Sequence, residues 1–540
     1  MKEVPVLIVG GGPVGLTASI LLSRKGIRSL LVERHAGTTL HPKARGINAR
    51  TMEIYRQCGV EASIREAGLP PEQAGLVVWT RTLAGEEIER RVPWRSGPQS
   101  ISVSPVRNCL CAQDALEPVL RSFAERQGCG ELLFSTEMIA FEQEDTWVKA
   151  TIANRVSGAQ TRVRARYVIA SDGAQSQIRR QLGVRMRGRE KVYDSINVLI
   201  KADLRPWTAH RPAALYFVEH PQMKATFLTI NGTDRWGFLI NNLSAYGYRA
   251  AEFTPDRSME LVRIAAGVPN LQVEVLGIVP WTASAIVAEQ YCHGRIFLAG
   301  DAAHEMPPTG GFGLNTGVQD VHNLAWKLAA VLKGVAGPSL LGTYHDERAP
   351  AGQVITDQSL NNSISMGRLA EHEHNAGTIV ARPEYLNEQG MIFGTCYSSP
   401  AVVSDGTAMA VVANPVTDYV PSARPGGRAP HVWLKHDGAR ISTLDFLGNG
   451  FVLLAGARGQ AWNETARRVA AEMNLPITTI GIRDGEAEDV DGQWAGIYGI
   501  DEAGAVLVRP DGYVGWRSLS MATDPPLALR AALARILSLT

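Results

Sequence analysis

Residues 294–327 read GRIFLAGDAAHEMPPTGGFGLNTGVQDVHNLAWK, and the fold is expected to be organised around this segment. The apolar run Ile296–Ala299 stops at Gly300-Asp301, which predicts a buried strand whose end carries one carboxylate. A helix is predicted over Leu314–Leu332, because apolar residues recur there at helical spacing. The loop between them contains Pro307, Pro308, Gly310, Gly311 and Gly313. Glycine lets main-chain N–H groups approach a ligand, and a helix N-terminus attracts negative charge, so the segment predicts an anion-binding turn.

A second turn of this kind lies near the N-terminus. The apolar run Pro5–Val9 predicts a parallel strand covered on both sides, and a helix is expected over Leu16–Arg24. The turn between them contains Gly10, Gly12, Pro13, Val14 and Gly15. The next predicted strand, Arg28–Val32, ends at Glu33, 18 residues after the last of these glycines. This G-x-G-x-x-G pattern places a pyrophosphate on the helix N-terminus and a ribose hydroxyl on the acidic residue, but it does not separate NAD from FAD.

A third strand end completes the pattern. Residues Val163–Ala170 predict a strand, and Asp172-Gly173 follow it closely. An aspartate at a strand end can fix a loop through its side chain, and Gly173 lets the main chain pass close to a phosphate. In a doubly wound sheet the carboxyl ends of the strands line one crevice. The three turns are therefore expected to meet around one dinucleotide.

Together these motifs resemble those of the flavoprotein aromatic hydroxylases, the para-hydroxybenzoate hydroxylase-like family of class A FAD monooxygenases, over nearly the whole chain. The phenol and aromatic polyketide hydroxylases are the most similar branch. The resemblance implies that Asp301 bonds the ribityl chain of FAD and that the proline-rich loop lies against the isoalloxazine ring. It also implies that Asp172-Gly173 contacts the pyrophosphate and takes part in nicotinamide binding, and that Arg45 and Gln113 contact the flavin. The cofactor-binding residues predicted in this way are Gly10, Gly12, Pro13, Val14, Gly15, Glu33, Arg34, Arg45, Gln113, Asp172, Gly173, Gly300, Asp301, Pro308, Gly311, Gly313, Leu314 and Asn315.

Some of these side chains also have an ordinary structural explanation. Gln113 stands at a predicted helix start, where it can satisfy backbone groups. Arg34 and Lys43 lie in the polar loop 34–50, and for these two we favour the interpretation that they solvate the loop. Arg45 lies in the same loop between two small residues and is the better candidate for a flavin contact.

The resemblance implies an NAD(P)H- and O2-dependent monooxygenase that hydroxylates a phenolic or polycyclic aromatic substrate through a flavin C4a-hydroperoxide. NADPH is weakly preferred to NADH, because Arg34 and Lys43 could meet a 2′-phosphate. The candidate catalytic residues are Arg45, Pro308 and Tyr216, and His220 is a further candidate for ionising the substrate. Phenol hydroxylases have an aspartate where this chain has Arg45, so their base mechanism does not transfer. A Baeyer–Villiger monooxygenase and a non-catalytic flavin-binding scaffold are the alternatives.

Between about residues 191 and 281 the pattern changes to alternating strands, which predicts an antiparallel sheet inserted into the α/β domain. The strands are expected at Ile196–Ala202, Ala213–Glu219, Ala225–Asn231 and Arg235–Asn241. Residues 75–93 are typical of a hairpin that joins the same sheet. The sheet is rich in aromatic residues, which are Tyr216, Phe217, Phe227, Trp236 and Phe238. Most of them are expected to pack in the core, and some to face a planar substrate.

The composition shifts to Ser, Pro, Gly and Asn around residues 398–434, which predicts a linker. The segments after it resemble the thioredoxin-like C-terminal domain of phenol and polyketide hydroxylases, with a helix over Trp462–Met473 and a hairpin over Ala505–Arg517. Without a C-x-x-C pair this domain cannot exchange dithiols, so packing or homodimer formation is its expected role. Before the linker, Pro350 is expected to end a helix.

The predicted fold is therefore α/β. It combines a Rossmann-like FAD domain (1–74, 95–185 and 282–400), an inserted antiparallel substrate-binding sheet (75–94 and 186–281) and a thioredoxin-like domain (401–540). A chain of 540 residues is long enough for three to four such units.

The composition argues against several other classes of protein. With 54 Lys and Arg against 53 Asp and Glu, the chain has no basic surplus for nucleic acid. No apolar run is long enough for a membrane span, and the N-terminus lacks a signal-peptide pattern, so a cytoplasmic protein is expected. The six cysteines include no C-x-x-C pair and the histidines are scattered. No metal site is predicted, and any chemistry with O2 must come from an organic cofactor.

Overall fold

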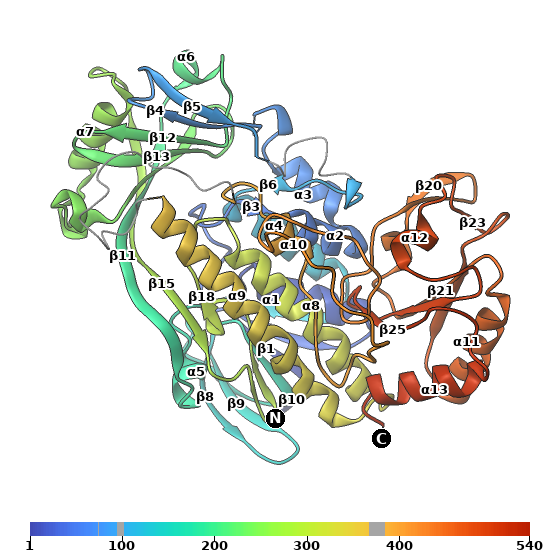
Figure 1. Cartoon of the computed structure of the whole chain (residues 1–540). Helices are drawn as coiled ribbons and strands as arrows, with labels where there is room; N and C mark the ends of the chain where they lie inside the picture. Colours follow the sequence, from blue (N-terminus) through green and yellow to red (C-terminus); the bar gives the residue numbers. More distant parts are fainter. Residues whose placement is uncertain (74, 94–101, 367–383, 540) are drawn as a thin grey trace.

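The first sheet is the one that the N-terminal strand predicts (Figure 1). In the computed structural model, which describes residues 1–73, 75–93, 102–366 and 384–539, its strands lie in the order β16-β17-β10-β1-β2-β7, and all but β16 run parallel. Their bounds are β1 Lys2–Val9, β2 Ser29–Val32, β7 Gly130–Leu133, β10 Gln160–Ala170, β16 Cys292–His293 and β17 Ile296–Leu298. The last four residues of β1 are buried, as a strand covered on both faces requires. The predicted Rossmann-like FAD domain is confirmed.

Helices and short ladders complete this domain. Helix α1 (Pro13–Arg24) packs against α4 (Gln113–Arg126) and α8 (Gly313–Leu332), so three helices meet beside the central strands. The smaller helices are α2 Ala49–Cys58, α3 Glu61–Ala67 and α5 Gln177–Gln181. Strand β9 (Val148–Asn154) pairs antiparallel with β10, and β8 (Thr136–Gln143) pairs antiparallel with β9. Strand β3 (Gly46–Ile47) pairs with β6 (Cys109–Leu110). The helix predicted over Leu314–Leu332 is confirmed and begins one residue earlier.

The second sheet has the strand order β18-β15-β11-β14-β13-β12-β4-β5. Its bounds are β4 Val77–Thr80, β5 Glu87–Arg91, β11 Met186–Lys201, β12 Leu215–His220, β13 Met223–Thr229, β14 Arg235–Asn241, β15 Glu274–Ala288 and β18 His304–Glu305. Helices α6 (Arg205–Thr208) and α7 (Pro255–Ala266) accompany it. The hairpin predicted at 75–93 joins this sheet through β4, which pairs with β12. Strand β11 is much longer than predicted, and β15 was not predicted; the two carry the sheet down to the first domain (Figure 1).

Adjacent residues of β12 lie on opposite faces of this sheet. Tyr216 belongs to the hydrophobic core that also contains buried residues of α7. Phe217 lies on the other face, where its ring stacks on Trp79 with centroids 5.1 Å apart. Leu199, on that same face, packs against Ala112 of the FAD domain. The face that carries Phe217 is therefore the one turned toward the FAD domain.

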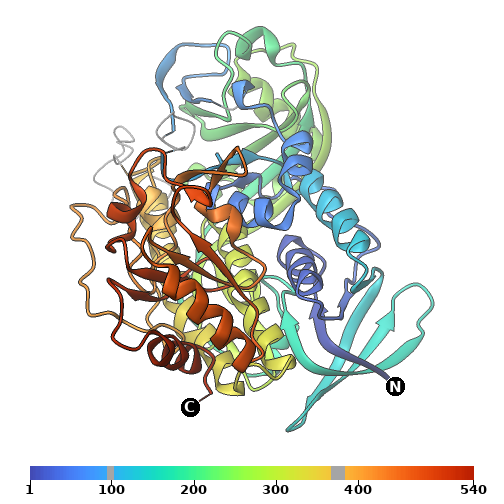
Figure 2. The ribbon, with the colours of Figure 1, turned by 90° about the vertical axis from the view of Figure 1, so that its right-hand side faces the viewer.

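The chain after the linker forms a third unit. It has one core of its own and shares a second core with Trp326, Ala330, Ala336 and Leu340 of the FAD domain. Its four-stranded sheet has the order β22-β21-β24-β25, with β21 and β22 parallel and the other neighbours antiparallel. The bounds in this unit are β19 Trp433–His436, β20 Ala439–Ser442, β21 Phe451–Ala455, β22 Ile477–Gly481, β23 Ala487–Glu488, β24 Ala505–Val508, β25 Val514–Ser518, α11 Gln460–Glu472, α12 Trp494–Tyr498 and α13 Pro525–Ile536. This is the predicted thioredoxin-like domain, and Figure 2 shows it, in orange and red, in front of the yellow helices of the FAD domain.

The prediction that Pro350 ends a helix is wrong. Helix α9 runs from Thr343 to Ser365 and contains Pro350 in its second turn. Proline removes one N–H donor, which leaves the carbonyl of Asp346 without its helical partner. Asp346 and Pro350 are both exposed, so water can bond that carbonyl and the helix continues.

The remaining elements are short. They are α10 Gln389–Phe393 and the 3-10 helices η1 Pro71–Gln73, η4 Leu243–Tyr246, η5 Ala250–Glu252, η6 Gly300–Ala302, η7 Pro338–Gly342 and η8 Thr443–Phe446. Among the helices of the described ranges, none combines the length and the apolar character needed to cross a bilayer. The domain boundaries given above stay a prediction, and parts of them, at residues 94–101 and 367–383, lie outside the described residues.

Candidate active site

The glycines of the first turn have two different functions. Gly10 has a φ of +108°, and a Cβ atom added to it would lie 2.2 Å from the carbonyl oxygen of Ser171. A Cβ atom on Gly15 would lie 1.9 Å from the carbonyl oxygen of Gly10. Gly12 is different, because the nearest atom to its added Cβ is Oε1 of Glu117 at 3.9 Å. Glycine at positions 10 and 15 is therefore required by the packing of the chain itself. Gly12 instead leaves its main chain accessible from the crevice at the carboxyl ends of the strands.

Helix α1 presents unshielded N–H groups to that space. Its N-cap is Gly12, and within the described chain the cap receives no side-chain hydrogen bond and the first turn holds no acidic residue. The first N–H groups of a helix have no partner inside it, so those of Val14 and Gly15 can bind an anion; Pro13 has no N–H. The turn fits a dinucleotide pyrophosphate.

Glu33 lies beside this turn at the end of β2. Its Oε2 accepts a hydrogen bond from the N–H of Gly11 at 2.6 Å, and its Oε1 accepts one from the N–H of His35 at 2.8 Å. The carboxylate is therefore fixed where a ribose hydroxyl is expected. Arg34, the next residue, is exposed.

Asp172 lies across the crevice from this position, at the end of β10. Its Oδ2 accepts a hydrogen bond from the N–H of Gln177 at 3.0 Å, whereas its Oδ1 is enclosed and has no hydrogen-bond partner among the described residues. Burial raises the pKa of this carboxyl above its usual range. Gly173 has a φ of +84° and open space around its Cα. An enclosed acceptor without a partner beside an open glycine fits a ligand that supplies donors.

Asp301 lies at the floor of the crevice. Its side chain is accessible to solvent, but burial by the surrounding chain raises its carboxyl pKa, while the charges of His304 and Lys43 lower it. Lys43 also lowers the pKa of Glu117, which burial raises. Lys43 itself is exposed in the loop 34–50, and the interpretation that it solvates this loop stays a prediction.

Gln113 ties the loop 34–50 to α4. Its Oε1 accepts a hydrogen bond from the N–H of Ala44 at 3.3 Å, and its Nε2 donates to Oε1 of Glu117 at 2.7 Å. Oε2 of Glu117 accepts from the N–H of Thr39 at 2.7 Å. Glu117 is a buried carboxyl that the sequence analysis missed, because a single glutamate inside a helix has no distinguishing pattern.

The start of α8 forms the opposite wall of the crevice. Phe312 is the N-cap, and in the described chain it makes no side-chain cap and no acidic residue follows in the first turn. The N–H groups of Gly313 and Leu314 therefore have no partner inside the helix, like those at the start of α1. Pro308 and Gly311, next to them, are exposed. Asn315 is engaged: its Nδ2 donates to the carbonyl of Gly46 at 2.9 Å, which fixes the loop before α2.

Arg45 connects the two sheets. Its Nη1 donates to the carbonyl of Thr229 at 2.9 Å, and its Nη2 donates to the carbonyl of Ala214 at 2.6 Å. Both carbonyls belong to the second sheet or its connections, whereas Arg45 belongs to the FAD domain. The guanidinium group therefore lies between the two domains, at the entrance to the space they enclose.

Tyr216 does not lie where its predicted catalytic role requires. Its side chain is 1% exposed, and its hydroxyl donates to the carbonyl of Arg211 at 2.8 Å and accepts from the N–H of Ala213 at 3.0 Å. Burial raises the pKa of this phenol to about 12. Tyr216 packs on the face away from the FAD domain and serves the core. His220 accepts a hydrogen bond from the N–H of Gln222 at 3.2 Å, at the turn after β12.

The second sheet turns other side chains toward the FAD domain. Trp79, Phe217, Asn241 and Met366 line a pocket on this face. Its volume is about 30 Å³, which is close to that of one water molecule, so an aromatic ring does not fit inside it as it stands. Trp79 and Phe217 are only 3% and 7% exposed and pack with Met366, Tyr385 and Leu386, so they form a buried cluster and not an open surface.

This arrangement defines a dinucleotide-binding flavoprotein of the FAD type, with an aromatic-rich sheet beside the nucleotide crevice. A family model described as an FAD binding domain matches residues 3–359, and one described as the C-terminal domain of aromatic-ring hydroxylases matches residues 422–539. The chain therefore belongs to the FAD-dependent aromatic hydroxylases, as the sequence motifs indicate, and it is an oxidoreductase of the monooxygenase type.

Relatives and solved structures agree with this assignment. A putative polyketide hydroxylase of Streptomyces halstedii is 41% identical over 100% of this chain and 98% of its own length. The 4-methyl-5-nitrocatechol 5-monooxygenase of Burkholderia sp. is 41% identical over 99% of this chain and 98% of its length. The crystal structure of a ternary complex of aklavinone-11 hydroxylase with FAD and aklavinone covers 100% of this chain and 99% of its own, with a TM-score of 0.90 and 35% identity. The flavin-dependent monooxygenase PieE, solved with FAD and substrate, gives a TM-score of 0.91 with 34% identity over 100% of this chain and 99% of its own.

Proposed function

We propose that this chain hydroxylates a polycyclic or phenolic aromatic substrate, with O2 and NADPH as co-substrates, in the space between the FAD crevice and the second sheet. The observation that carries the proposal is that three strand-end turns meet. A Cβ atom on Gly10 would lie 2.2 Å from Ser171, and one on Gly300 would lie 3.0 Å from Val14. Arg45 joins the loop beside these turns to the second sheet. Relatives named as polyketide and nitrocatechol oxygenases support this class of substrate.

The cofactor would be held by groups of the FAD domain. The N–H groups at the start of α1 and the open Gly12 would take the pyrophosphate, and Glu33 would take a ribose hydroxyl. Asp301 would bond the ribityl chain, and the N–H groups of Gly313 and Leu314 would face negative charge on the flavin ring. When bound, FAD supplies the hydride acceptance and the activation of O2 that no side chain of the protein can supply.

The protein's own residues would position the aromatic ring and exclude water. Arg45 holds the second sheet against the FAD domain through the carbonyls of Thr229 and Ala214, and so sets the width of the space between them. Pro308 stands exposed in the loop beside this space and would limit the position of the ring. The buried cluster around Phe217 and Trp79 would support the sheet face that is turned toward the FAD domain.

The remaining expectations belong to the same proposal. NADPH would be preferred over NADH, because the exposed side chains of Arg34 and Lys43 could meet a 2′-phosphate. The protein would act in the cytoplasm, where reduced nicotinamide cofactors are available. Formation of a homodimer stays a prediction for the thioredoxin-like domain.

The test is to purify the protein, record its flavin spectrum and measure NADPH oxidation with a panel of phenols and polycyclic aromatics. The proposal expects a yellow protein, stimulated oxidation with at least one substrate, and a product heavier by one oxygen atom with the aromatic ring intact. A product with an oxygen inserted into a ring of the substrate would indicate Baeyer–Villiger chemistry. Flavin binding with no stimulated NADPH oxidation by any substrate would indicate a scaffold.

A further inference from the structure

The turn that carries Asp301 is held from beneath by Asp320 of α8. Oδ2 of Asp320 accepts a hydrogen bond from the N–H of Gly300 at 3.1 Å and contacts Nε2 of His304 at 2.7 Å. Burial alone would raise the pKa of the Asp320 carboxyl, but His304 and Arg348 together lower it below its usual range, so it stays ionised. One buried carboxylate thus bonds the main chain of Gly300 at one end of the turn and the side chain of His304 at the other.

Arg348 of α9 is the cation that compensates this carboxylate. Its Nε donates to Oδ1 of Asp320 at 2.8 Å, and its Nη2 donates to the carbonyl of Thr316 at 3.2 Å. Both side chains of the ion pair are completely buried. The third contact of the guanidinium leads away from the FAD domain, because Nη1 donates to the hydroxyl of Tyr397 at 3.0 Å.

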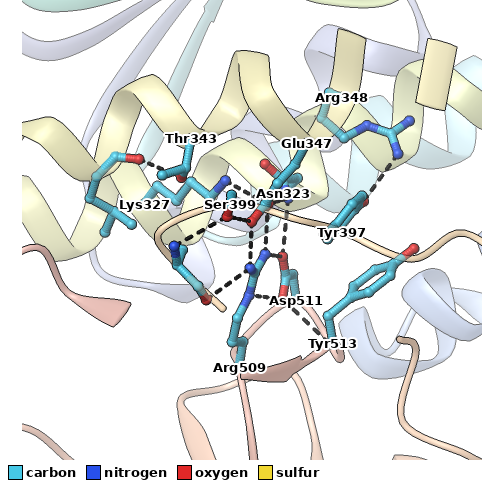
Figure 3. Close-up of polar contacts among 12 residues, drawn as sticks. Asn323, Lys327, Thr343, Glu347, Arg348, Tyr397, Ser399, Arg509, Asp511 and Tyr513 are labelled. Atoms are coloured by element: carbon cyan, nitrogen blue, oxygen red, sulfur yellow. Dashed lines mark hydrogen bonds and ion pairs between the residues drawn. The ribbon is translucent and has the colours of Figure 1, made fainter. Parts of the chain in front are cut away.

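Tyr397 passes this contact to the thioredoxin-like domain. Its ring stacks on the ring of Tyr513, with centroids 4.1 Å apart and planes 28° apart. Tyr513 lies in the connection between β24 and β25. Figure 3 shows Tyr397 between Arg348 and the β24–β25 hairpin.

A second set of buried charges fixes this hairpin to the FAD domain. Arg509 donates to both oxygens of Glu347, with Nη1–Oε1 at 2.6 Å and Nη2–Oε2 at 2.9 Å, and Lys327 donates to Oε2 of Glu347 at 2.8 Å. Asp511 accepts a hydrogen bond from Asn323 (Figure 3) and another from the indole N–H of Trp326. Buried ion pairs add little net stability, because desolvation offsets their attraction, but their directional bonds fix one relative position of the groups.

We propose that the thioredoxin-like domain positions the flavin-binding turn Gly300-Asp301 through a buried chain of four side chains, Tyr513, Tyr397, Arg348 and Asp320. Glu347 and Arg348 are neighbours on α9, so the helix holds the hairpin with one residue and the turn with the next. The domain thereby acts on FAD binding without any thiol chemistry and without touching the cofactor. The inference rests on FAD binding in this crevice and not on the identity of the aromatic substrate.

The substitution Tyr397→Phe tests the chain, because it removes the hydroxyl that Arg348 contacts and keeps the stacked ring. FAD is titrated into the flavin-free full-length protein, and binding is followed by the quenching of flavin fluorescence. The Kd for FAD is expected to rise about three- to tenfold, since one hydrogen bond to a charged group is lost. Amide hydrogen exchange in residues 298–304 is expected to become faster in the same variant.

Tyr498→Phe is the matched control. Tyr498 is also a fully buried tyrosine whose hydroxyl makes one hydrogen bond, to the carbonyl of Pro430 at 2.8 Å, but it lies inside the thioredoxin-like domain. It should lose thermal stability and keep the wild-type Kd for FAD. If Tyr397→Phe gives the same Kd and the same exchange in residues 298–304 as this control, the proposed chain does not act on the turn. If the unaltered protein binds no FAD at all, the proposed function fails instead.

A second measurement needs no substitution. Native-state hydrogen exchange of the unaltered protein at increasing urea concentration reports which segments open together. Residues 298–304 and residues 505–518 are expected to exchange through one opening reaction with the same urea dependence. Independent opening of the two segments would overturn the proposal even where the variants cannot be purified.

Discussion

A Cβ atom on Gly15 would lie 1.9 Å from the carbonyl oxygen of Gly10, so the close approach of these two residues requires glycine at position 15. Both residues serve the packing of α1 on the strand before it. Gly12, between them in the sequence, meets nothing of the chain within 3.9 Å. One motif thus contains positions that serve the fold and a position that serves the ligand, and substitution can separate them.

Gly12→Ala should leave folding intact and weaken FAD binding. The free energy of unfolding of the flavin-free protein should change by less than about 0.5 kcal/mol. The Kd for FAD should rise about tenfold or more, because the added methyl occupies the side from which the pyrophosphate approaches. Gly15→Ala should instead destabilise the flavin-free protein by about 1–3 kcal/mol through overpacking. Urea unfolding and FAD titration of both variants measure the two effects, and equal behaviour of the two variants would refute the distinction.

Asp301→Ala should purify with little bound flavin. The carboxylate lies at the floor of the crevice, and its loss removes the acceptor predicted for the ribityl hydroxyls. The ratio of absorbance at the flavin band to that of the protein gives the occupancy. Asp484→Ala, at an exposed position in the C-terminal domain, is the control and should keep full occupancy. Full flavin occupancy in Asp301→Ala would show that this side chain does not bind the cofactor.

Arg45→Ala should slow turnover more than it lowers stability. Its two hydrogen bonds to the carbonyls of Thr229 and Ala214 set the spacing of the two domains. Without them the substrate is held less accurately, so kcat should fall by a factor of about ten or more. Thermal unfolding gives the stability change, and steady-state NADPH oxidation gives kcat. Arg467→Ala, an exposed arginine of α11, should change neither. Unaltered kinetics in Arg45→Ala would leave this residue a purely structural bridge.

Substitutions of Tyr216 and Phe217, which are neighbours in β12, should have different effects: the first should change stability and the second should change KM. Tyr216→Phe leaves the N–H of Ala213 without a partner, so it should cost about 1–3 kcal/mol of unfolding free energy and leave KM for the aromatic substrate unchanged. Phe217→Leu changes the face turned toward the FAD domain, so it should alter KM about three- to tenfold. Steady-state kinetics and urea unfolding separate the two outcomes. A changed KM in Tyr216→Phe would restore that residue as a substrate contact.

Glu305 should make the flavin-free protein less stable as the pH rises. Burial, together with the charge of Asp301, raises the pKa of Glu305 from 4.5 to about 7, and its side chain is 18% exposed. The folded chain therefore holds a proton between pH 4.5 and 7 that the unfolded chain has lost, and stability falls across this window by an amount on the order of 3 kcal/mol. It should be constant above pH 7. Glu305→Gln should remove this part of the pH dependence in urea unfolding, and an unchanged pH profile would assign the dependence to other groups.

The sequence could predict the elements that have local signatures. The strand-turn-helix units at Gly10–Gly15 and Gly300–Asp301 were identified because glycines, a carboxylate and helical spacing occur together within a few residues. The faces of the second sheet could not be assigned in the same way. Tyr216 and Phe217 are both apolar aromatic residues, and alternation that is apolar on both faces does not say which face meets the other domain.

The contacts between domains were also beyond the sequence. Glu347 and Arg509 are 162 residues apart, and Glu53 and Arg428 are 375 residues apart, yet both pairs are buried ion pairs. Such partners have no spacing that a sequence pattern can detect. The continuation of α9 through Pro350 could not be predicted for a related reason. Only the exposure of Asp346 in the structure shows that its carbonyl, left without a helical partner, costs the helix little.

Strands β11 and β15 run side by side from Met186 and Ala288 to Lys201 and Glu274, so the two halves of the molecule are joined by one long ladder. The ladder has register shifts between Arg189 and Tyr193 and between Leu199 and Ile200, and extra residues are absorbed at such bulges. In the regular stretch between them, one added residue would turn the following side chains to the opposite face of the sheet. Changes of residue type therefore reshape the wall that meets a substrate with less disturbance than changes of strand length. Diversification of substrate choice on this scaffold is expected to proceed by exchange of side chains at fixed register.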